Sequence, residues 1–433
     1  MQQQAAKQLG FWSVWALAAG TMIGSGILLL PAALAPYGLI SYGGWLLGAA
    51  GAIAIVLCFA RLAARTARDG GPYVYVQEAF GDLAGFLMAW GYWVSFWVAI
   101  PVVAIAFVGY LGVFVPAMAQ DAIAQALGAL ALIAVLTFVN MRGLKEMSAA
   151  QIAMTVLKIV PLLTILGAAI AFGAPRNLPP FNPSDAPLLP QLAAVTLITL
   201  WPFTGFEAAV ANARAVREPE RTIPRALIAA ILFVTAIYLA ASLAVNLLVP
   251  ADQLAQSQAP FADAARVLGP WGAMFVAAGA LAATAGTLNG IIFAAGQMPM
   301  AVAEDRKAPA WLADLNKGGA PYWSLLLSAS LGSGLLLLNF SRGFLGAFTF
   351  LLMMATAICL IYYFFCALAE LKHSYRTSKL WAAVALFACA YALFAVFGSG
   401  VEVALWGGLL LLLGVPLFYL CRRRGDAAVK APA

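Results

Sequence analysis

The sequence predicts an all-α integral membrane protein with twelve transmembrane helices, and three observations lead to this fold class. The first is composition: 64% of the 433 residues are hydrophobic and only 9% are charged, whereas soluble domains carry roughly 25% charged residues. The second is a series of twelve apolar stretches, each close to the roughly 20 residues that a membrane-spanning helix needs. The third is the uneven distribution of lysine and arginine between these stretches.

The twelve predicted spans are separated by charged residues or by clusters of proline and glycine. They cover residues 11–35, 41–60, 84–115, 122–139, 149–172, 192–211, 226–249, 271–302, 322–338, 344–368, 380–397 and 401–420. Little sequence remains for a soluble domain, so we expect a single membrane-embedded unit.

Lysine and arginine lie almost entirely on one side of these spans. If the amino terminus is cytoplasmic, twenty of the 24 fall in cytoplasmic segments, three (Arg176, Arg266 and Arg342) fall outside, and Lys158 lies within a span. Cytoplasmic loops carry the excess of positive residues, so both termini are expected in the cytoplasm. A miscounted helix would place several basic loops on the wrong side, which supports the count of twelve.

Neither metal nor nucleic acid is an expected partner. The five cysteines form no CxxC pair and His373 is the single histidine, so we expect no metal site, no disulfide framework and no cofactor. The net charge of +7 comes from residues scattered between apolar runs rather than from one basic face, which excludes a nucleic-acid surface.

The polar start of the chain is not followed by a small-residue cleavage site at the distance typical of a signal peptide. We therefore expect the first helix to remain in the mature protein.

Two predicted spans contain helix-breaking residues at mid-membrane depth. The first contains Gly20-Thr21-Met22-Ile23-Gly24-Ser25-Gly26 and the sixth contains Trp201-Pro202-Phe203-Thr204-Gly205-Phe206-Glu207. Backbone that leaves the helix within a membrane is tolerated only where it is buried or lines a cavity. Interruptions at corresponding positions of two halves indicate a transporter's central site, where helix ends and freed carbonyls hold a polar ligand. The alternative is that Gly24 and Gly26 serve close helix packing.

Two ionisable residues lie deep within predicted spans: Lys158 in the fifth and Glu207 at the second break. A charge at mid-bilayer costs about 3 kcal/mol or more, so such residues usually take part in ion, proton or substrate movement. The alternatives are a structural ion pair or, for Lys158, a side chain that reaches the membrane interface.

The remaining candidates are aromatic and polar side chains. Tyr92 and Ser95 are three residues apart and share a helix face, but the aromatic cluster around them is equally typical of helix packing. Trp201, beside the second break, is the stronger candidate for a lid over a substrate. Asn289 in the eighth span has two explanations, a hydrogen bond to a ligand or a cross-link between helices.

These motifs together resemble the amino acid–polyamine–organocation superfamily, and most closely its bacterial arginine/agmatine and putrescine/ornithine antiporters. The resemblance covers essentially the whole chain and rests on Gly20 to Ile27 with Pro31, Gly70-Gly71-Pro72-Tyr73, Leu200 to Glu207, Glu218 to Arg221 with Pro224, and Phe397-Gly398-Ser399-Gly400. It implies an inner-membrane protein with two inverted five-helix repeats, interrupted helices one and six, and two extra helices. The implied segments are a cytoplasmic tail (1–10), the repeats (11–172 and 173–368), helices eleven and twelve (369–420) and a second cytoplasmic tail (421–433).

The resemblance also implies roles for individual residues. An α-carboxylate would meet backbone N–H groups around Ser25 and Gly26, Trp201 would cover the ligand, and Glu207 would act in gating. The α-amino group would meet freed carbonyls near Met22, Trp201 and Thr204. The full set of expected substrate contacts is Thr21, Met22, Gly24, Ser25, Gly26, Tyr92, Ser95, Phe96, Trp201, Phe203, Thr204, Gly205, Asn289 and Ile291, with Lys158 and Glu207 for coupling and gating.

Three positions differ from the arginine/agmatine antiporters: Thr21 replaces an asparagine, Ile100 a polar residue and Ile291 a gating tryptophan. These changes remove groups that would serve a long cationic side chain, so they favour a neutral or apolar ligand side chain. Lys158 instead resembles the lysine of proton-coupled and light-chain-type amino acid transporters, where its ammonium takes the place of a sodium ion. That resemblance implies independence from sodium.

We therefore expect a secondary active transporter of a small amino acid or related amine, working by alternating access through exchange or proton coupling. The alternative is an antiporter of polyamines or basic amino acids, of the putrescine, ornithine, arginine, agmatine or cadaverine type. A channel or a non-transporting receptor is a remote alternative, because neither charge rings, filter repeats nor a large loop are visible. No enzymatic constellation is present in the sequence, and the choice between monomer and homodimer stays open.

Overall fold

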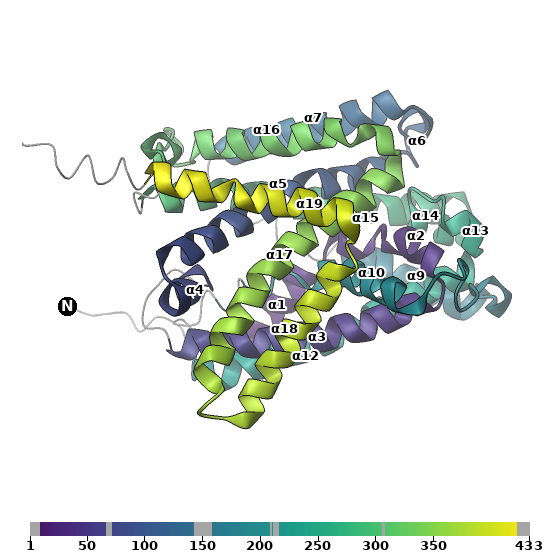
Figure 1. Cartoon of the computed structure of the whole chain (residues 1–433). Coiled ribbons are helices and arrows are strands. Elements are labelled where there is room, and N and C mark those ends of the chain that lie inside the picture. Colours follow the sequence, from purple (N-terminus) through teal and green to yellow (C-terminus); the bar gives the residue numbers. More distant parts are fainter. Residues whose placement is uncertain are drawn as a thin grey trace, which may run out of the picture.

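The computed structural model describes residues 9–65, 72–142, 158–207, 210, 216–304 and 308–421. Over these residues the chain is helical, and its only β-type pairing is an isolated bridge between Leu9 and Val216. Figure 1 shows long helices packed side by side, with short helices and turns at their ends. The first part of the predicted fifth span, 149–157, lies outside the described residues, as do Gly70 and Gly71.

The α-helices have the following bounds: α1 Phe11–Met22, α2 Leu30–Leu34, α3 Ile40–Arg65, α4 Pro72–Phe80, α5 Asp82–Leu111, α6 Pro116–Gln120, α7 Ala122–Arg142, α9 Ile159–Phe172, α10 Leu188–Leu200, α12 Pro219–Leu248, α13 Ala251–Leu254, α14 Pro260–Ala264, α15 Pro270–Glu304, α16 Tyr322–Leu338, α17 Phe344–Ser374, α18 Lys379–Phe397 and α19 Gly400–Leu412. The 3-10 helices are η1 Ser25–Ile27, η2 Ala35–Tyr37, η4 Pro175–Asn177, η5 Trp201–Phe203, η7 Ala265–Leu268, η8 Ala310–Ala313 and η9 Phe340–Arg342.

Eight described helices are long and apolar enough to cross a bilayer: α3, α5, α7, α12, α15, α17, α18 and the segment Gly400–Cys421 that begins with α19. Another candidate is a broken span, in which Phe11–Ile27 and Leu30–Tyr37 meet at an angle of 65°. Three shorter apolar helices cover Pro161–Phe172, Leu188–Phe203 and Tyr322–Leu338. The protein is therefore an all-helical, multi-pass membrane protein, as its composition predicts.

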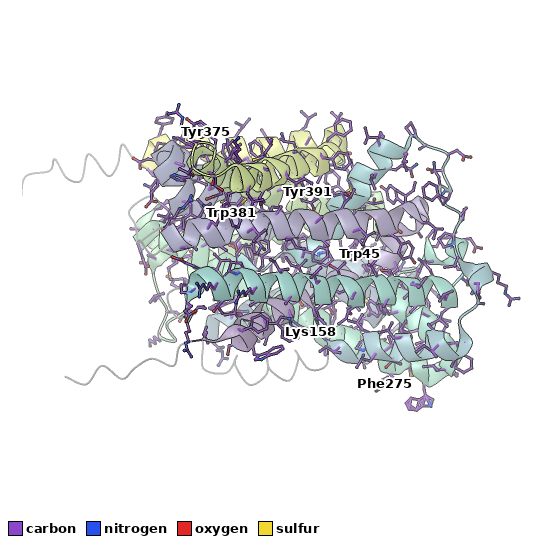
Figure 2. All side chains as sticks on the ribbon, turned by 90° about the horizontal axis from the view of Figure 1, so that it is seen from below. Trp45, Lys158, Phe275, Tyr375, Trp381 and Tyr391 are labelled. Atoms are coloured by element: carbon purple, nitrogen blue, oxygen red, sulfur yellow. The ribbon has the colours of Figure 1, made fainter. Side chains whose placement is uncertain are left out.

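The apolar helices divide into an inner and an outer set. In α5, 83% of the most apolar window is buried, whereas in α7 and in Gly400–Cys421 only 22% is buried. Since all three are similarly apolar, the exposed side chains of the outer helices are placed to face lipid. Figure 2 shows Trp45 and Tyr391 among the packed helices, whereas Phe275, which is half exposed, lies near the edge of the bundle.

Close helix approach at the centre depends on small residues. A Cβ added to Gly332 in α16 would lie 2.9 Å from the carbonyl oxygen of Trp97 in α5, so any larger side chain would push these helices apart.

At the ends of α3 and α17, buried Glu370 accepts hydrogen bonds from Arg61 at 2.7 Å and from Arg65 at 2.9 Å. Two guanidinium groups thus compensate one buried carboxylate and tie the helices together.

Candidate substrate-binding site

Both predicted helix interruptions are present. Helix α1 ends at Met22, after which Ile23 and Gly24 are extended (ψ 98° and −153°) before η1 begins. Helix α10 ends at Leu200 and passes through η5 to an extended Thr204 (ψ 156°). Gly205 then adopts φ +104°, a region that favours glycine. These non-helical backbone conformations end both helices.

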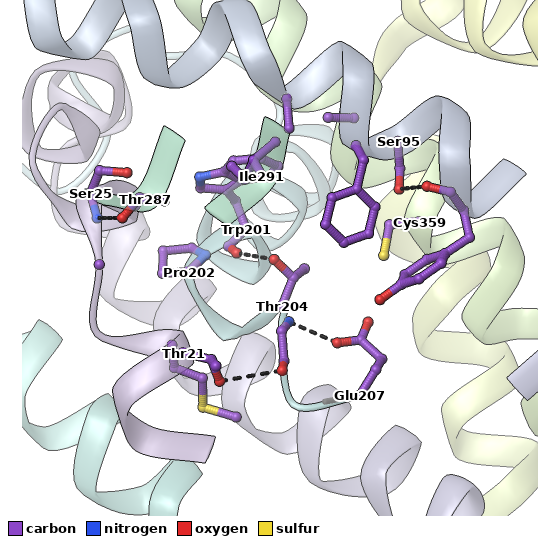
Figure 3. Close-up of a pocket in the computed structure, with 18 residues that line it drawn as sticks. Thr21, Ser25, Ser95, Trp201, Pro202, Thr204, Glu207, Thr287, Ile291 and Cys359 are labelled. Carbon is purple, nitrogen blue, oxygen red and sulfur yellow. Dashed lines mark hydrogen bonds between the residues drawn. The ribbon is translucent and has the colours of Figure 1, made fainter. Parts of the chain in front are cut away.

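The two interruptions face each other across a cavity of about 160 Å³ (Figure 3). Side chains of α5, α15 and α17 complete its walls. Its lining residues are Thr21, Met22, Gly24, Ser25, Gly26, Tyr92, Ser95, Phe96, Ala99, Trp201, Pro202, Thr204, Gly205, Glu207, Thr287, Ile291, Ala355 and Cys359.

Direct contacts hold the two breaks together. The Thr21 hydroxyl donates to the carbonyl oxygen of Ala18 at 2.8 Å and also lies 3.3 Å from the carbonyl oxygen of Gly205. A Cβ added to Gly26 would lie 3.2 Å from the Cα of Pro202, closer than most side chains tolerate. Gly26 therefore both lines the cavity and permits close packing, so the two explanations for this glycine are compatible.

Several polar groups freed by the breaks already have partners within the protein. The carbonyl oxygen of Met22 accepts a hydrogen bond from the Tyr238 hydroxyl at 2.7 Å, and the Ser25 N–H donates to the Thr287 hydroxyl at 3.4 Å. The Ser25 hydroxyl, by contrast, is buried and has no hydrogen-bond partner among the described residues. An unsatisfied buried hydroxyl in a cavity wall suits a polar ligand.

Glu207 supplies the only formal charge among the described residues that line the cavity. It is 4% exposed and accepts a hydrogen bond from the Gly205 N–H at 2.8 Å. The hydroxyl of Tyr363 in α17 donates a second hydrogen bond to the same carboxylate. Hydrogen bonds from two donors fix the position of this carboxyl group in the cavity wall.

The remaining wall is largely apolar, with the hydroxyl groups of Ser95 and Thr204 among its polar atoms. Phe96 and Tyr92 of α5 meet edge to face, with ring centroids 4.8 Å apart, and Trp201 is half-buried. In the view of Figure 3, Ser25 and Thr287 lie on one side of Trp201 and Glu207 lies on the other. The cavity therefore suits a ligand with an apolar middle and polar ends.

Comparison with known proteins identifies the family. The family profile described as amino acid permease matches residues 9–416. The chain belongs to the amino acid permease family. It is therefore a member of the amino acid–polyamine–organocation superfamily, as the motifs indicate.

Individual relatives of this permease are known as exchangers and transporters. It is 32% identical to a cadaverine/lysine antiporter of Escherichia coli K12 over 77% of the permease and 75% of the relative. It is 30% identical to an arginine/ornithine antiporter of Pseudomonas aeruginosa, over 96% and 92% of the two chains. The putrescine transporter PotE of E. coli K12 is 28% identical over 98% of both chains.

Four residues singled out from the sequence do not line the cavity of the permease. Phe203 is fully buried and packs edge to face on Trp45, and Ile100 is also fully buried. Asn289 accepts a hydrogen bond from Asn140 of α7 at 2.8 Å, so it forms the helix cross-link that was one of its two explanations. Lys158 is buried immediately before α9 and is labelled in Figure 2.

Other lining residues of the permease were not predicted as site residues. Thr287 stands out in the sequence as a polar interruption of an apolar span, so its pattern was a usable signal. Cys359 and Ala355 in α17 carry no such signal, because neither is a polar interruption of its apolar span. In the part of the chain that the structure describes, no three His, Cys, Asp or Glu side chains are grouped to hold a metal ion.

Proposed function

We propose that this permease is a secondary active transporter of an amino acid or related amine that binds its substrate in the cavity between the two helix breaks. The observation that carries the proposal is the shared cavity itself, which combines interrupted backbone, an unpartnered Ser25 hydroxyl and the anchored Glu207 carboxylate. Membership of the permease family gives the activity class.

We further propose twelve spans arranged as inverted repeats over 11–172 and 173–368, followed by two helices in 369–420 and flanked by cytoplasmic tails over 1–10 and 421–433. Eight long helices, one broken span and three shorter apolar helices among the described residues support this count. The distribution of lysine and arginine supports cytoplasmic termini in a bacterial inner membrane.

Within this class, the site favours a substrate with a cationic amine near Glu207. A buried carboxylate beside a small cavity is stabilised by an opposite charge on the ligand. Relatives named for cadaverine, lysine, arginine, ornithine and putrescine add support for a diamine or a basic amino acid. If two such substrates are exchanged, the Glu207 carboxylate is paired with a substrate amine in both the inward and the outward half of the transport cycle.

A small amino acid with a neutral side chain is the second candidate, and a specific observation favours it. Phe96 and Ile291 line the cavity with apolar surface, and a cavity of about 160 Å³ leaves little room for a long side chain. In this arrangement the α-carboxylate would meet backbone N–H groups at Ser25 and Gly26, with Trp201 over the ligand.

We propose that the structure represents an inward-facing state. Thr21, at the end of α1, is exposed, whereas Ile27 to Leu34 beyond the break are buried. On that outer side the Tyr110 hydroxyl donates to the Leu28 carbonyl oxygen at 2.8 Å and accepts from the Phe261 N–H at 3.3 Å. These hydrogen bonds would have to break when the cavity becomes accessible from the outside.

Lys158 is our candidate for the coupling residue. It is 7% exposed and lies immediately before α9. A cation in that setting can replace a bound sodium ion or carry a proton. We therefore propose transport that does not require sodium, driven by exchange or by protons.

Uptake into proteoliposomes tests the function. Vesicles loaded with unlabelled putrescine, lysine, alanine or buffer receive labelled putrescine, lysine or alanine outside. The proposal expects uptake that rises severalfold when a substrate is present inside, with no need for sodium. No saturable uptake of any amino acid or amine, by correctly folded protein, would contradict it. Uptake of labelled putrescine or lysine would indicate a cationic substrate, and uptake of labelled alanine would indicate a neutral one.

A further inference from the structure

A second cavity, of about 310 Å³, lies apart from the candidate substrate site. It is formed by the beginning of α5, the end of α15, the segment containing η8, the middle of α16 and the end of the last span. The two cavities have no lining residue in common. The second cavity is therefore not part of the candidate substrate site.

The wall of the second cavity is apolar. Among the described residues no charged or hydroxyl side chain lines it. Two of its tryptophans have their indole N–H groups occupied elsewhere: Trp90 donates to the Leu410 carbonyl oxygen at 2.8 Å, and Trp93 donates to the Ser328 hydroxyl at 2.9 Å. These rings consequently present carbon surface to the cavity, which suits a hydrocarbon occupant.

Four lining residues are exposed and mark the mouth: Pro309, Trp311, which is 45% exposed, and Leu331 and Leu417, which are each 37% exposed. Leu331 lies in the apolar helix α16, and Leu417 lies in the last span, which is one of the two outer helices placed to face lipid. Tryptophan at such a position is typical of the membrane interface. In Figure 1 the beginning of α16 and the end of the last span lie at the same end of the molecule as α4, which belongs to the predicted cytoplasmic connection between the second and third spans. The mouth therefore faces the membrane on the side that we assign to the cytoplasm.

The sequence that follows the last lining residue indicates which lipid would enter. Cys421 lines the cavity, and Arg422, Arg423 and Arg424 follow it directly in the sequence. Clusters of basic residues immediately after a transmembrane helix attract anionic headgroups. We propose that this cavity holds an acyl chain of an anionic phospholipid from the surrounding membrane, with its headgroup attracted by these arginines.

Native mass spectrometry of the detergent-purified full chain tests this proposal. Phosphatidylglycerol and phosphatidylcholine with the same acyl chains are added in equal amounts. We expect one phosphatidylglycerol retained per chain, severalfold more than phosphatidylcholine. Leu331→Trp fills the mouth and should remove this retention. Leu338→Trp is the matched control, because Leu338 is on the same helix, is 79% exposed and lies outside the cavity.

The charge and fold controls separate the remaining outcomes. Replacing Arg422, Arg423 and Arg424 by glutamine should keep one lipid per chain but lose the preference for phosphatidylglycerol. If Leu331→Trp does not elute as folded protein, Leu417→Trp fills the mouth from the opposite wall. Equal retention in wild type and in a folded filling variant overturns the proposal. Equal retention of the two lipids by the wild type, or a lipid-free dimer disrupted by the filling variant, also overturns it.

Discussion

The hydroxyl of Tyr363 donates a hydrogen bond to the carboxylate of Glu207, which lies 156 positions earlier in the chain. The Gly205 N–H, within the second break, donates to the same carboxylate at 2.8 Å. One buried acidic group thus connects the irregular backbone after α10 to the continuous helix α17. A change at Glu207 should therefore alter both the charge of the cavity and the position of the break.

Glu207→Gln keeps the shape of the side chain and removes its charge. We expect about 30-fold weaker binding of putrescine, since a hydrogen bond to a charged group contributes about 2 kcal/mol and each factor of ten is about 1.4 kcal/mol. Binding is measured by isothermal titration calorimetry on purified protein. Glu402→Gln is the control, because Glu402 is an exposed carboxylate that pairs with Arg342. Unchanged putrescine binding in a folded Glu207→Gln protein would exclude Glu207 as the amine partner.

Trp201→Ala should weaken substrate binding by more than tenfold. The half-buried indole lines the cavity beside the break, and loss of one well-placed aromatic contact commonly costs about 2 kcal/mol of binding free energy. The apparent affinity is measured from the concentration dependence of proteoliposome uptake. Trp12→Ala, at an exposed position of α1, should leave that affinity unchanged. Equal affinities for all three proteins would place the substrate elsewhere.

Lys158→Ala should abolish transport while the protein remains folded in the membrane. The buried ammonium group is the proposed substitute for a sodium ion, so its removal takes away the coupling charge. Uptake is measured with an imposed pH gradient, in sodium and in sodium-free buffer. Lys317→Ala changes an exposed lysine and should retain full activity. Full activity of Lys158→Ala would remove the ammonium group from the mechanism.

Gly205→Ala should lower the thermal stability of the permease. An alanine held at φ +104° is strained, and backbone strain of this kind costs about 1–3 kcal/mol. The melting temperature is followed by tryptophan fluorescence in detergent. Gly334→Ala in α16 has open space around its Cβ, and should be stabilising by about 0.5–1 kcal/mol because alanine is the better helix former. Equal melting temperatures for Gly205→Ala and wild type would mean that the second break relaxes without strain.

Local sequence chemistry was sufficient to predict the membrane helices and the two breaks. Long apolar runs can only be buried or face lipid, and Gly24, Gly26, Pro202 and Gly205 each disfavour a regular helix at their own position. These effects depend on a residue and its immediate neighbours. The position of Glu207 beside the second break follows in the same way.

Which side chains face the cavity was decided only by the tertiary structure. Each step along a helix turns the side chain by about 100°, so neighbouring candidates point in different directions once the helix is packed. Ile291 therefore lines the cavity, whereas Asn289, two residues earlier, bonds to Asn140 on another helix. Tyr363 reaches Glu207 because α17 packs against the second break, and no local pattern in an apolar span encodes that contact. The helix breaks follow from local backbone preferences, but the set of groups that meets a substrate depends on how distant helices rotate and pack.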